Sequence, residues 1–180
     1  RAPHPEQDIA ALARAARVRF QGGLLGWSRN GEDGKGLQTI VDDLEHLLKS
    51  ACSEPVALLW WVCAGVAELL QNGGLQVTPA IKRQFGQVDR QIKRLMDHGE
   101  PVFSDILTDD LLKNLLFHVY NSDASSPRLA EISSTYGFDN LSAGEESEDV
   151  SSVNLAACSE ELLQTVSGTV REDIVRIKGQ

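Results

Sequence analysis

The chain has 180 residues, of which 42% are hydrophobic, so it has the length of one ordinary domain and enough apolar content for a core. Its 26 acidic residues outnumber its 17 basic ones, giving a formal net charge of −9. This balance argues against nucleic acid as the main partner, because phosphate binding needs a basic face.

Helical periodicity dominates the first 51 residues. Apolar residues recur every three or four positions from Ile9 to Trp27 and again from Leu37 to Ala51. This spacing predicts two amphipathic helices. The stretch 30–36 between them is rich in glycine and asparagine, which favour a turn.

The third element, 55–71, is the most informative segment. Its apolar run from Val56 to Leu70 is broken only by one glycine and one glutamate, and a helix that is hydrophobic on all sides must be enclosed. The run has 15 residues and spans roughly 22 Å, whereas a membrane-spanning helix needs roughly 20 residues. Because Trp60 and Trp61 lie in mid-run, we expect a central helix of a soluble bundle with both indoles sealed from solvent.

Three further helices follow, each marked by residues typical of helix ends. The fourth has Thr78 as N-cap and ends at His98, before a glycine. The fifth opens at Thr108, where two acids favour the helix dipole, and ends at Tyr120. A shorter sixth covers 126–137. The fold predicted is all-α, a bundle of about six helices around the central apolar helix.

We place the bundle domain at 6–138, and the composition of the sequence changes after it. Residues 139–154 contain five acids and no base, which predicts a flexible acidic linker. An amphipathic helix is expected at 155–178, with no partner in the remaining sequence. We interpret it as the start of a following domain, with folding back on the bundle as the alternative. A chain without an initiator Met or a signal-peptide pattern is expected to be a segment of a longer protein.

One string resembles a phosphotransfer site. His46 is followed at three residues by Lys49 and then by Ser50, while histidine phosphotransfer domains carry His-x-x-Lys-Gly on a bundle helix. A lysine at this spacing lies on the same helix face and can steady an added phosphoryl charge. However, serine replaces the glycine and the helix ends soon afterwards. His46 with Lys49 is therefore a candidate phosphoacceptor, and a solvated surface histidine is the alternative.

No other pattern predicts catalysis or a bound group. The remaining histidines are isolated, and the three cysteines are widely spaced, without disulfide or zinc spacing, which favours a reducing cytosol. The glycine pairs lack the strand and helix context of a phosphate-binding loop. We expect no catalytic residue, no cofactor and no metal in this segment.

The fourth helix is interpreted as the one basic segment of an acidic chain. It carries five bases against two acids, and arginine favours carboxylate recognition. We expect this face either to bind an acidic partner or to be merely solvated. Trp27, interpreted as exposed, is a second candidate contact. The candidate partner-binding residues are Arg83, Arg90, Lys93 and Arg94.

Several strings, taken in order, resemble the N-terminal region of the PilL/ChpA-type hybrid histidine kinases of the type IV pilus chemosensory system. Each string alone is unspecific, whereas their order is fairly specific, and together they cover about residues 10–140. The strings are residues 23–27 (GLLGW), 58–62 (LLWWV), 87–95 (QVDRQIKRL), 109–117 (DDLLKNLLF), 126–128 (SPR) and 136–139 (YGFD), with 170–174 (VREDI) near the end.

This resemblance implies a degenerate phosphotransfer-like domain that is not phosphorylated, similar also to a stand-alone relative that regulates twitching motility. The function expected is a non-catalytic interaction module of a two-component chemosensory kinase. Its partners would be response regulators or a pole-organising protein, with no nucleic acid and no membrane. The location expected is the cytoplasm, with recruitment to the cell pole. An active phosphotransfer domain using His46 and an architectural spacer between neighbouring domains are the alternatives.

Overall fold

A computed structural model describes residues 5–29, 34–106, 109–123 and 126–138, and the chain divides into two compact units, 1–124 and 125–180. Every regular element among the described residues is helical, so the predicted all-α fold is confirmed. The predicted linker at 139–154 and the helix at 155–178 lie outside the described residues. The elements are α1 (Pro5–Arg29), α2 (Lys35–Ser50), α3 (Glu54–Gln71), α4 (Pro79–His98), the 3-10 helix η1 (Glu100–Phe103), α5 (Asp110–Tyr120) and α6 (Pro127–Thr135).

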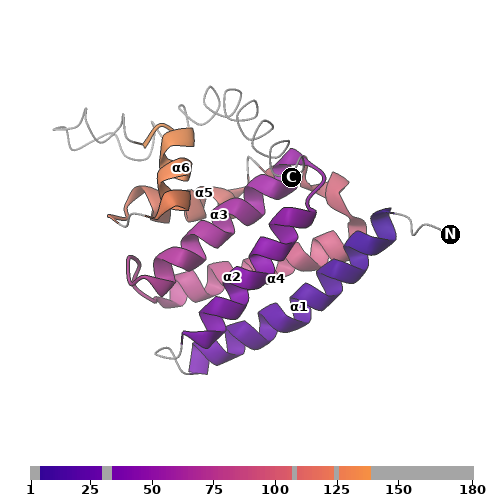
Figure 1. The fold of residues 1–180 in the computed structure, drawn as a ribbon, viewed down its shortest axis with the longest axis horizontal. Coiled ribbons are helices and arrows are strands. Elements are labelled where there is room, and N and C mark those ends of the chain that lie inside the picture. Colours follow the sequence, from indigo (N-terminus) through magenta and orange to yellow (C-terminus); the bar gives the residue numbers. More distant parts are fainter. Residues whose placement is uncertain (1–4, 30–33, 107–108, 124–125, 139–180) are drawn as a thin grey trace. The chain divides into compact units, whose positions relative to one another are not determined.

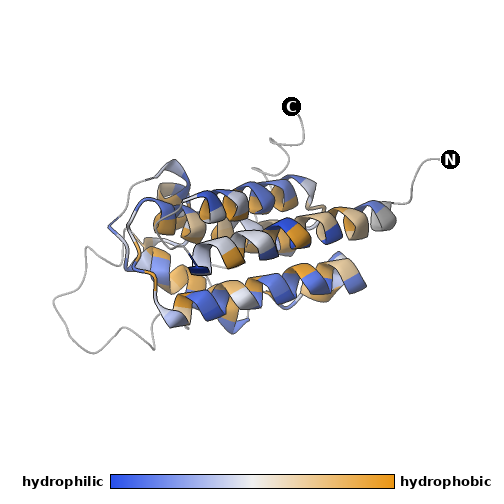
Figure 2. Ribbon diagram, turned by 90° about the horizontal axis from the view of Figure 1, so that it is seen from below, coloured by the Kyte–Doolittle hydropathy of each residue, from blue (hydrophilic) through white to orange (hydrophobic). Residues whose placement is uncertain are grey.

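The first unit contains every element except α6. Helix α1 packs between α2 and α4, α2 packs between α1 and α3, and α3 also contacts α5 (Figure 1). Helices α1 to α4 alternate in direction, and α4 packs against α1 (Figure 1). In Figure 2 these helices carry hydrophobic and hydrophilic residues on different sides, as amphipathic helices of a bundle do.

Helix α3 forms the centre of the core, as its apolar run predicted. Thirteen of its 18 residues are buried, and the Trp60 ring lies edge-on to Phe103, with 6.3 Å between ring centroids. The expectation that Trp61 is also sealed is wrong, because its side chain is only partly buried. Trp61 and the partly buried Glu68 are seven residues apart, so they lie on one line along α3. No helix in the described part of the chain is long and apolar enough to cross a membrane.

The helix ends follow the capping residues closely. The Thr78 hydroxyl accepts a hydrogen bond from the Ile81 amide at 3.3 Å, as expected for the N-cap of α4. At α5 the N-cap is Asp109, whose carboxylate accepts from the Leu111 amide at 2.8 Å. The assignment of that cap to Thr108, which itself lies outside the described residues, is thereby corrected.

Two glycines let α1 and α2 approach closely. A Cβ atom at Gly36 would lie 2.7 Å from both the Gly23 carbonyl oxygen and the Trp27 amide nitrogen. A Cβ at Gly23 would lie 2.9 Å from the Gly36 carbonyl oxygen. Real Cβ atoms do not come this close to other atoms, so this contact between the two helix backbones requires glycine on both sides.

The second unit is described over residues 126–138. Ser126 is the N-cap of α6, and its hydroxyl accepts a hydrogen bond from the Leu129 amide at 3.2 Å. After the helix, the rings of Tyr136 and Phe138 stack with 5.8 Å between centroids. The predicted sixth helix is therefore present, at the place that its Ser-Pro start indicated.

Candidate protein-interaction surface

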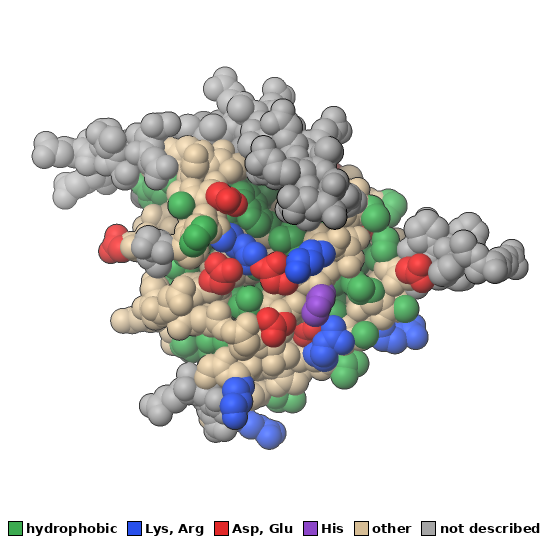
Figure 3. All heavy atoms as spheres, viewed as in Figure 1, with side chains coloured by type: hydrophobic (Ala, Val, Ile, Leu, Met, Phe, Trp, Pro, Cys, Tyr) green, Lys and Arg blue, Asp and Glu red, His purple; other side chains and the backbone are tan. Residues whose placement is uncertain are grey.

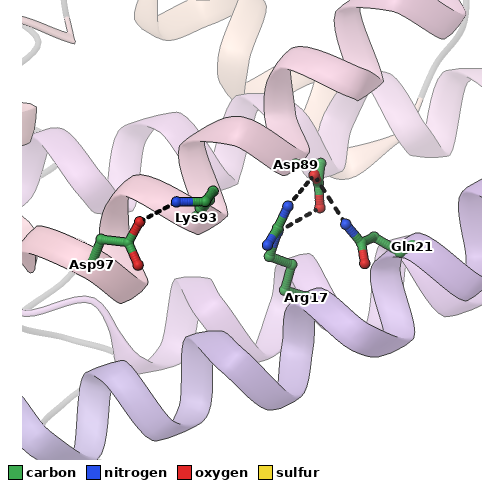
Figure 4. Close-up of polar contacts among 5 residues, drawn as sticks. All are labelled: Arg17, Gln21, Asp89, Lys93 and Asp97. Atoms are coloured by element: carbon green, nitrogen blue, oxygen red, sulfur yellow. Dashed lines mark hydrogen bonds and ion pairs between the residues drawn. The ribbon is translucent and has the colours of Figure 1, made fainter.

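Helices α1 and α4 are joined by a bidentate ion pair. The Arg17 guanidinium donates from Nε and Nη2 to the two carboxylate oxygens of Asp89, at 3.1 and 3.0 Å (Figure 4). The Gln21 amide donates to the same carboxylate at 3.3 Å. Since both charged side chains are largely buried, Asp89 is neutralised within the chain and adds little negative field to the surface.

Two of the four bases expected to bind a partner are engaged within the chain. Lys93 forms an ion pair with Asp97 one turn along α4, and this hydrogen bond is the main reason why the pKa of Asp97 lies below its usual value (Figure 4). Arg94 donates to the Val102 carbonyl oxygen at 2.9 Å, and its guanidinium lies 5.3 Å from the Phe103 ring centroid. Arg94 therefore fixes η1 against α4.

The other two bases, Arg83 and Arg90, are exposed. They lie seven residues apart on α4, on the side opposite its buried residues Ile81, Phe85, Val88, Ile92 and Leu95. Neither forms an ion pair or a hydrogen bond with any residue that the structure describes. These two guanidinium groups are thus available to an external carboxylate.

Helix α4 is not the only basic element, which corrects the interpretation made from the sequence. Helix α1 carries four arginines and has no acid between Ile9 and Gly31, and it packs beside α4. Together the two helices hold nine bases and four acids, whereas the whole chain holds 17 and 26. The acid-free run could have been noticed in the sequence, but its proximity to α4 could not. We call this surface the α1–α4 face, defined by the exposed bases Arg14, Arg29, Lys82, Arg83 and Arg90.

A groove of about 440 Å³ runs between α1 and α4 on this face. Trp27 lies within it but is only 1% exposed, so the expectation of an exposed tryptophan is wrong. The reason is that Trp27 lies seven residues after the buried Phe20, on the inner side of α1. Its ring meets Phe85 edge-on at 5.6 Å, and the Lys82 ammonium lies 6.0 Å from its centroid. The groove is lined by Gln21, Leu24, Leu25, Trp27, Ser28, Lys82, Gly86 and Asp89.

His46 lies on the exposed side of α2, as predicted, four residues before the helix ends. Its backbone carbonyl accepts a hydrogen bond from the Ser50 hydroxyl at 2.8 Å, so the residue in the glycine position is used to close the last turn. The face drawn in Figure 3, over α2 in the view of Figure 1, carries interspersed acidic and basic side chains.

A buried carboxylate lies one turn before His46. Asp43 is 1% exposed and accepts a hydrogen bond from Arg19 Nε of α1 at 2.7 Å, while its second oxygen has no partner among the described residues. Burial raises the pKa of Asp43, and the Arg19 guanidinium only partly offsets this effect. Nothing in the sequence pattern distinguished Asp43 from its exposed neighbour Asp42.

The histidine of α5 is a packed residue. His118 Nε2 lies 2.9 Å from the Gln84 side-chain oxygen of α4, and burial lowers the pKa of its imidazole. In the described ranges no three histidine, cysteine, aspartate or glutamate side chains gather in an arrangement that could hold a metal ion. The polar groups around His118 therefore connect helices, as do those around Asp43 and Asp89.

The fold and surface define an all-α helical-bundle domain with a basic face formed by its first and fourth helices. A family model described as "FimL scaffold protein second domain" matches residues 5–149, and the chain belongs to that family. It is 25% identical over 173 residues to the scaffold protein FimL of Pseudomonas aeruginosa. That match covers 96% of this chain but only 30% of the relative's length. No solved structure matches the chain.

Proposed function

We propose that this domain is a non-catalytic scaffold and regulatory module of the type IV pilus chemosensory system, acting in the control of twitching motility. Its membership of the FimL second-domain family supports a scaffold. The similarity to a complete scaffold protein supports the same role, although the chain spans about a third of that relative. The domain acts in the cytoplasm and is recruited to the cell pole through its partners.

The observation that carries this proposal is the basic surface that the acidic chain keeps on α1 and α4. Arg83 and Arg90 form no ion pair with a carboxylate of the described residues, although the chain as a whole has nine more acidic than basic residues. Exposed bases left unpaired in such a chain favour an external acidic partner and steer its approach. The partners that we propose are response regulators of the pilus system or a pole-organising protein.

Charge reversal tests this proposal directly. Arg83→Glu with Arg90→Glu, placed in the full-length native protein, should weaken binding to a purified pilus chemosensory partner at least about tenfold and shrink the twitching zone. The matched control is Lys35→Glu with Lys113→Glu, two exposed lysines on α2 and α5 that give the same change in net charge. Equal effects of both pairs, or no effect of the first, would remove the α1–α4 face from consideration.

An active phosphotransfer domain, of the kind found in the PilL/ChpA-type kinases, remains the second candidate. The exposure of His46 on a bundle helix favours it. Two observations argue against it. The Ser50 hydroxyl is used in a hydrogen bond to the His46 carbonyl at the helix end, and His46 lies in the last turns of α2. A scaffold therefore accounts for more of the surface than a phosphorelay does.

A further inference from the structure

We propose that the groove between α1 and α4 binds an acidic amphipathic helix of a partner protein, which inserts one bulky apolar side chain beside Leu25 and above Trp27. This inference rests on the proposed function, since it assigns a partner chemistry to the same face. It adds a specific apolar anchor to what would otherwise be a purely electrostatic surface.

The groove provides apolar surface where the bundle leaves α1 uncovered. Leu25 lines it and is 57% exposed, and Val18, seven residues earlier on the same side of α1, is 69% exposed. These are two of the largest exposures of a large hydrophobic side chain among the described residues. Across the groove, a Cβ atom at Gly86 would meet nothing within 4 Å, so α4 leaves open space there.

Charges around the groove select an acidic occupant. Lys82 lines the groove. Four further bases are exposed near it along the two helices: Arg14 lies four residues before Val18 and Arg29 four after Leu25 on α1, while Arg83 follows Lys82 and Arg90 lies four residues after Gly86 on α4. The acids of α4 are already paired, Asp89 with Arg17 and Asp97 with Lys93. An occupant would therefore meet uncompensated positive charge on both sides of the apolar strip, which favours carboxylates on both flanks of its apolar face.

The same charges argue against a second copy of this chain as the occupant. A symmetric dimer places the same patch on both sides of the interface, so it would bring these arginines against their own counterparts. An extended acidic peptide fits less well than a helix, because Val18 and Leu25 have the seven-residue spacing at which helices present successive anchors. A helix lying along α1 and α4 also repeats the packing already used within the bundle.

A library of displayed helical peptides, selected for binding to this 180-residue chain, tests the inference. Peptides of about 20 residues, randomised at their exposed positions, would be displayed and sorted for binding to the wild-type chain. The selected peptides are then measured for binding to a Gly86→Leu variant, which is left out of the selection. This variant fills the groove and, because leucine is a far better helix former than glycine, should raise the melting temperature. Loss of binding then cannot be attributed to unfolding.

The expected outcome is enrichment of sequences with glutamate and aspartate beside leucine or phenylalanine at positions i, i+3 or i+4, and i+7. Selected peptides should bind the wild type at least tenfold more tightly than Gly86→Leu and Leu25→Asp. Asn114→Leu, which adds the same side chain at an exposed site of α5, should bind them like the wild type.

Three results would overturn the inference. They are enrichment of basic or charge-independent sequences, equal binding to Gly86→Leu, and self-association of the wild type that Gly86→Leu abolishes. Failure of the inference is distinguishable from failure of the proposed function. If Arg83→Glu with Arg90→Glu stops binding of a pilus partner but Gly86→Leu does not, the scaffold role stands and the groove is not its anchor.

Discussion

Asp89 of α4 receives both of its strong hydrogen bonds from one side chain, Arg17 of α1, 72 residues earlier in the chain. The two side chains are only 14% and 24% exposed, so water screens the pair weakly. This bidentate pair fixes the register of the first helix against the fourth, and it lies at one end of the groove on the α1–α4 face.

A double-mutant cycle of Arg17→Ala and Asp89→Ala should give a coupling energy of about 1–2 kcal/mol, because the bonds are bidentate, charge-assisted and partly buried. Urea unfolding of the four proteins measures it. The surface pair of Lys93 and Asp97 is the control and should couple more weakly. A coupling no larger than that of the control would contradict the role given to Asp89.

The buried carboxylate of Asp43 should make stability depend on pH. Because its pKa is raised in the folded state above the ordinary value of 3.8, its contribution is fully present below 3.8 and is lost as the pH rises through the folded pKa. Asp43→Asn does not titrate. Its free energy of unfolding relative to wild type should therefore increase from about pH 4 to about pH 7.

Urea titrations at several pH values across that range measure this difference for Asp43→Asn. Asp42→Asn, at the exposed neighbouring position, controls for the loss of one negative charge from α2. A difference that stays constant or shrinks with rising pH would show that the Arg19 guanidinium outweighs burial at Asp43.

Replacing Gly36 by alanine should destabilise the domain by about 1–3 kcal/mol, the usual cost of forcing extra volume into a packed contact. The new methyl group would press on the Gly23 carbonyl and the Trp27 backbone. Gly86→Ala is the matched control, since its methyl group meets open space and alanine favours a helix by up to about 1 kcal/mol. Thermal unfolding should thus shift in opposite directions for the two variants, and shifts of the same sign would refute the glycine contact.

If the domain is a scaffold, His46 should not accept a phosphoryl group. Incubation of the wild type with phosphorylated receiver domains of the pilus system should leave no acid-labile phosphate on the chain. His46→Ala should keep partner binding and twitching within about twofold of wild type, as an exposed surface substitution does. Acid-labile labelling that His46→Ala removes would instead establish the phosphorelay.

Local sequence signals predicted the helices well, because each signal acts within one turn. Thr78 and Pro79 at the start of α4 and Gly99 after its end are such signals, and the helix has the predicted bounds. The apolar run of α3 similarly predicted a central helix, since no other placement could bury it. Trp61 is only partly buried, and hydrophobicity alone does not show which residues of a central helix will be fully enclosed.

The candidate surface was only partly predictable, because it is formed by residues far apart in sequence. The sequence indicated bases on α4, but not that Arg94 binds η1 or that the arginines of α1 lie beside α4. The prediction of an exposed Trp27 is wrong, because its spacing of seven residues from Phe20 places both on one side of α1. The groove itself depends on how α1 and α4 meet, which no local pattern encodes.

The order of packing in the bundle has a consequence during translation. The first helix can pair with the second as soon as both have left the ribosome, but its other flank needs the fourth. Until then Trp27 lacks Phe85 and Arg17 lacks Asp89. A nascent chain that stalls before α4 therefore has three helices with the α4 side of α1 still exposed to solvent, and this apolar side, with Trp27, is where a chaperone would bind.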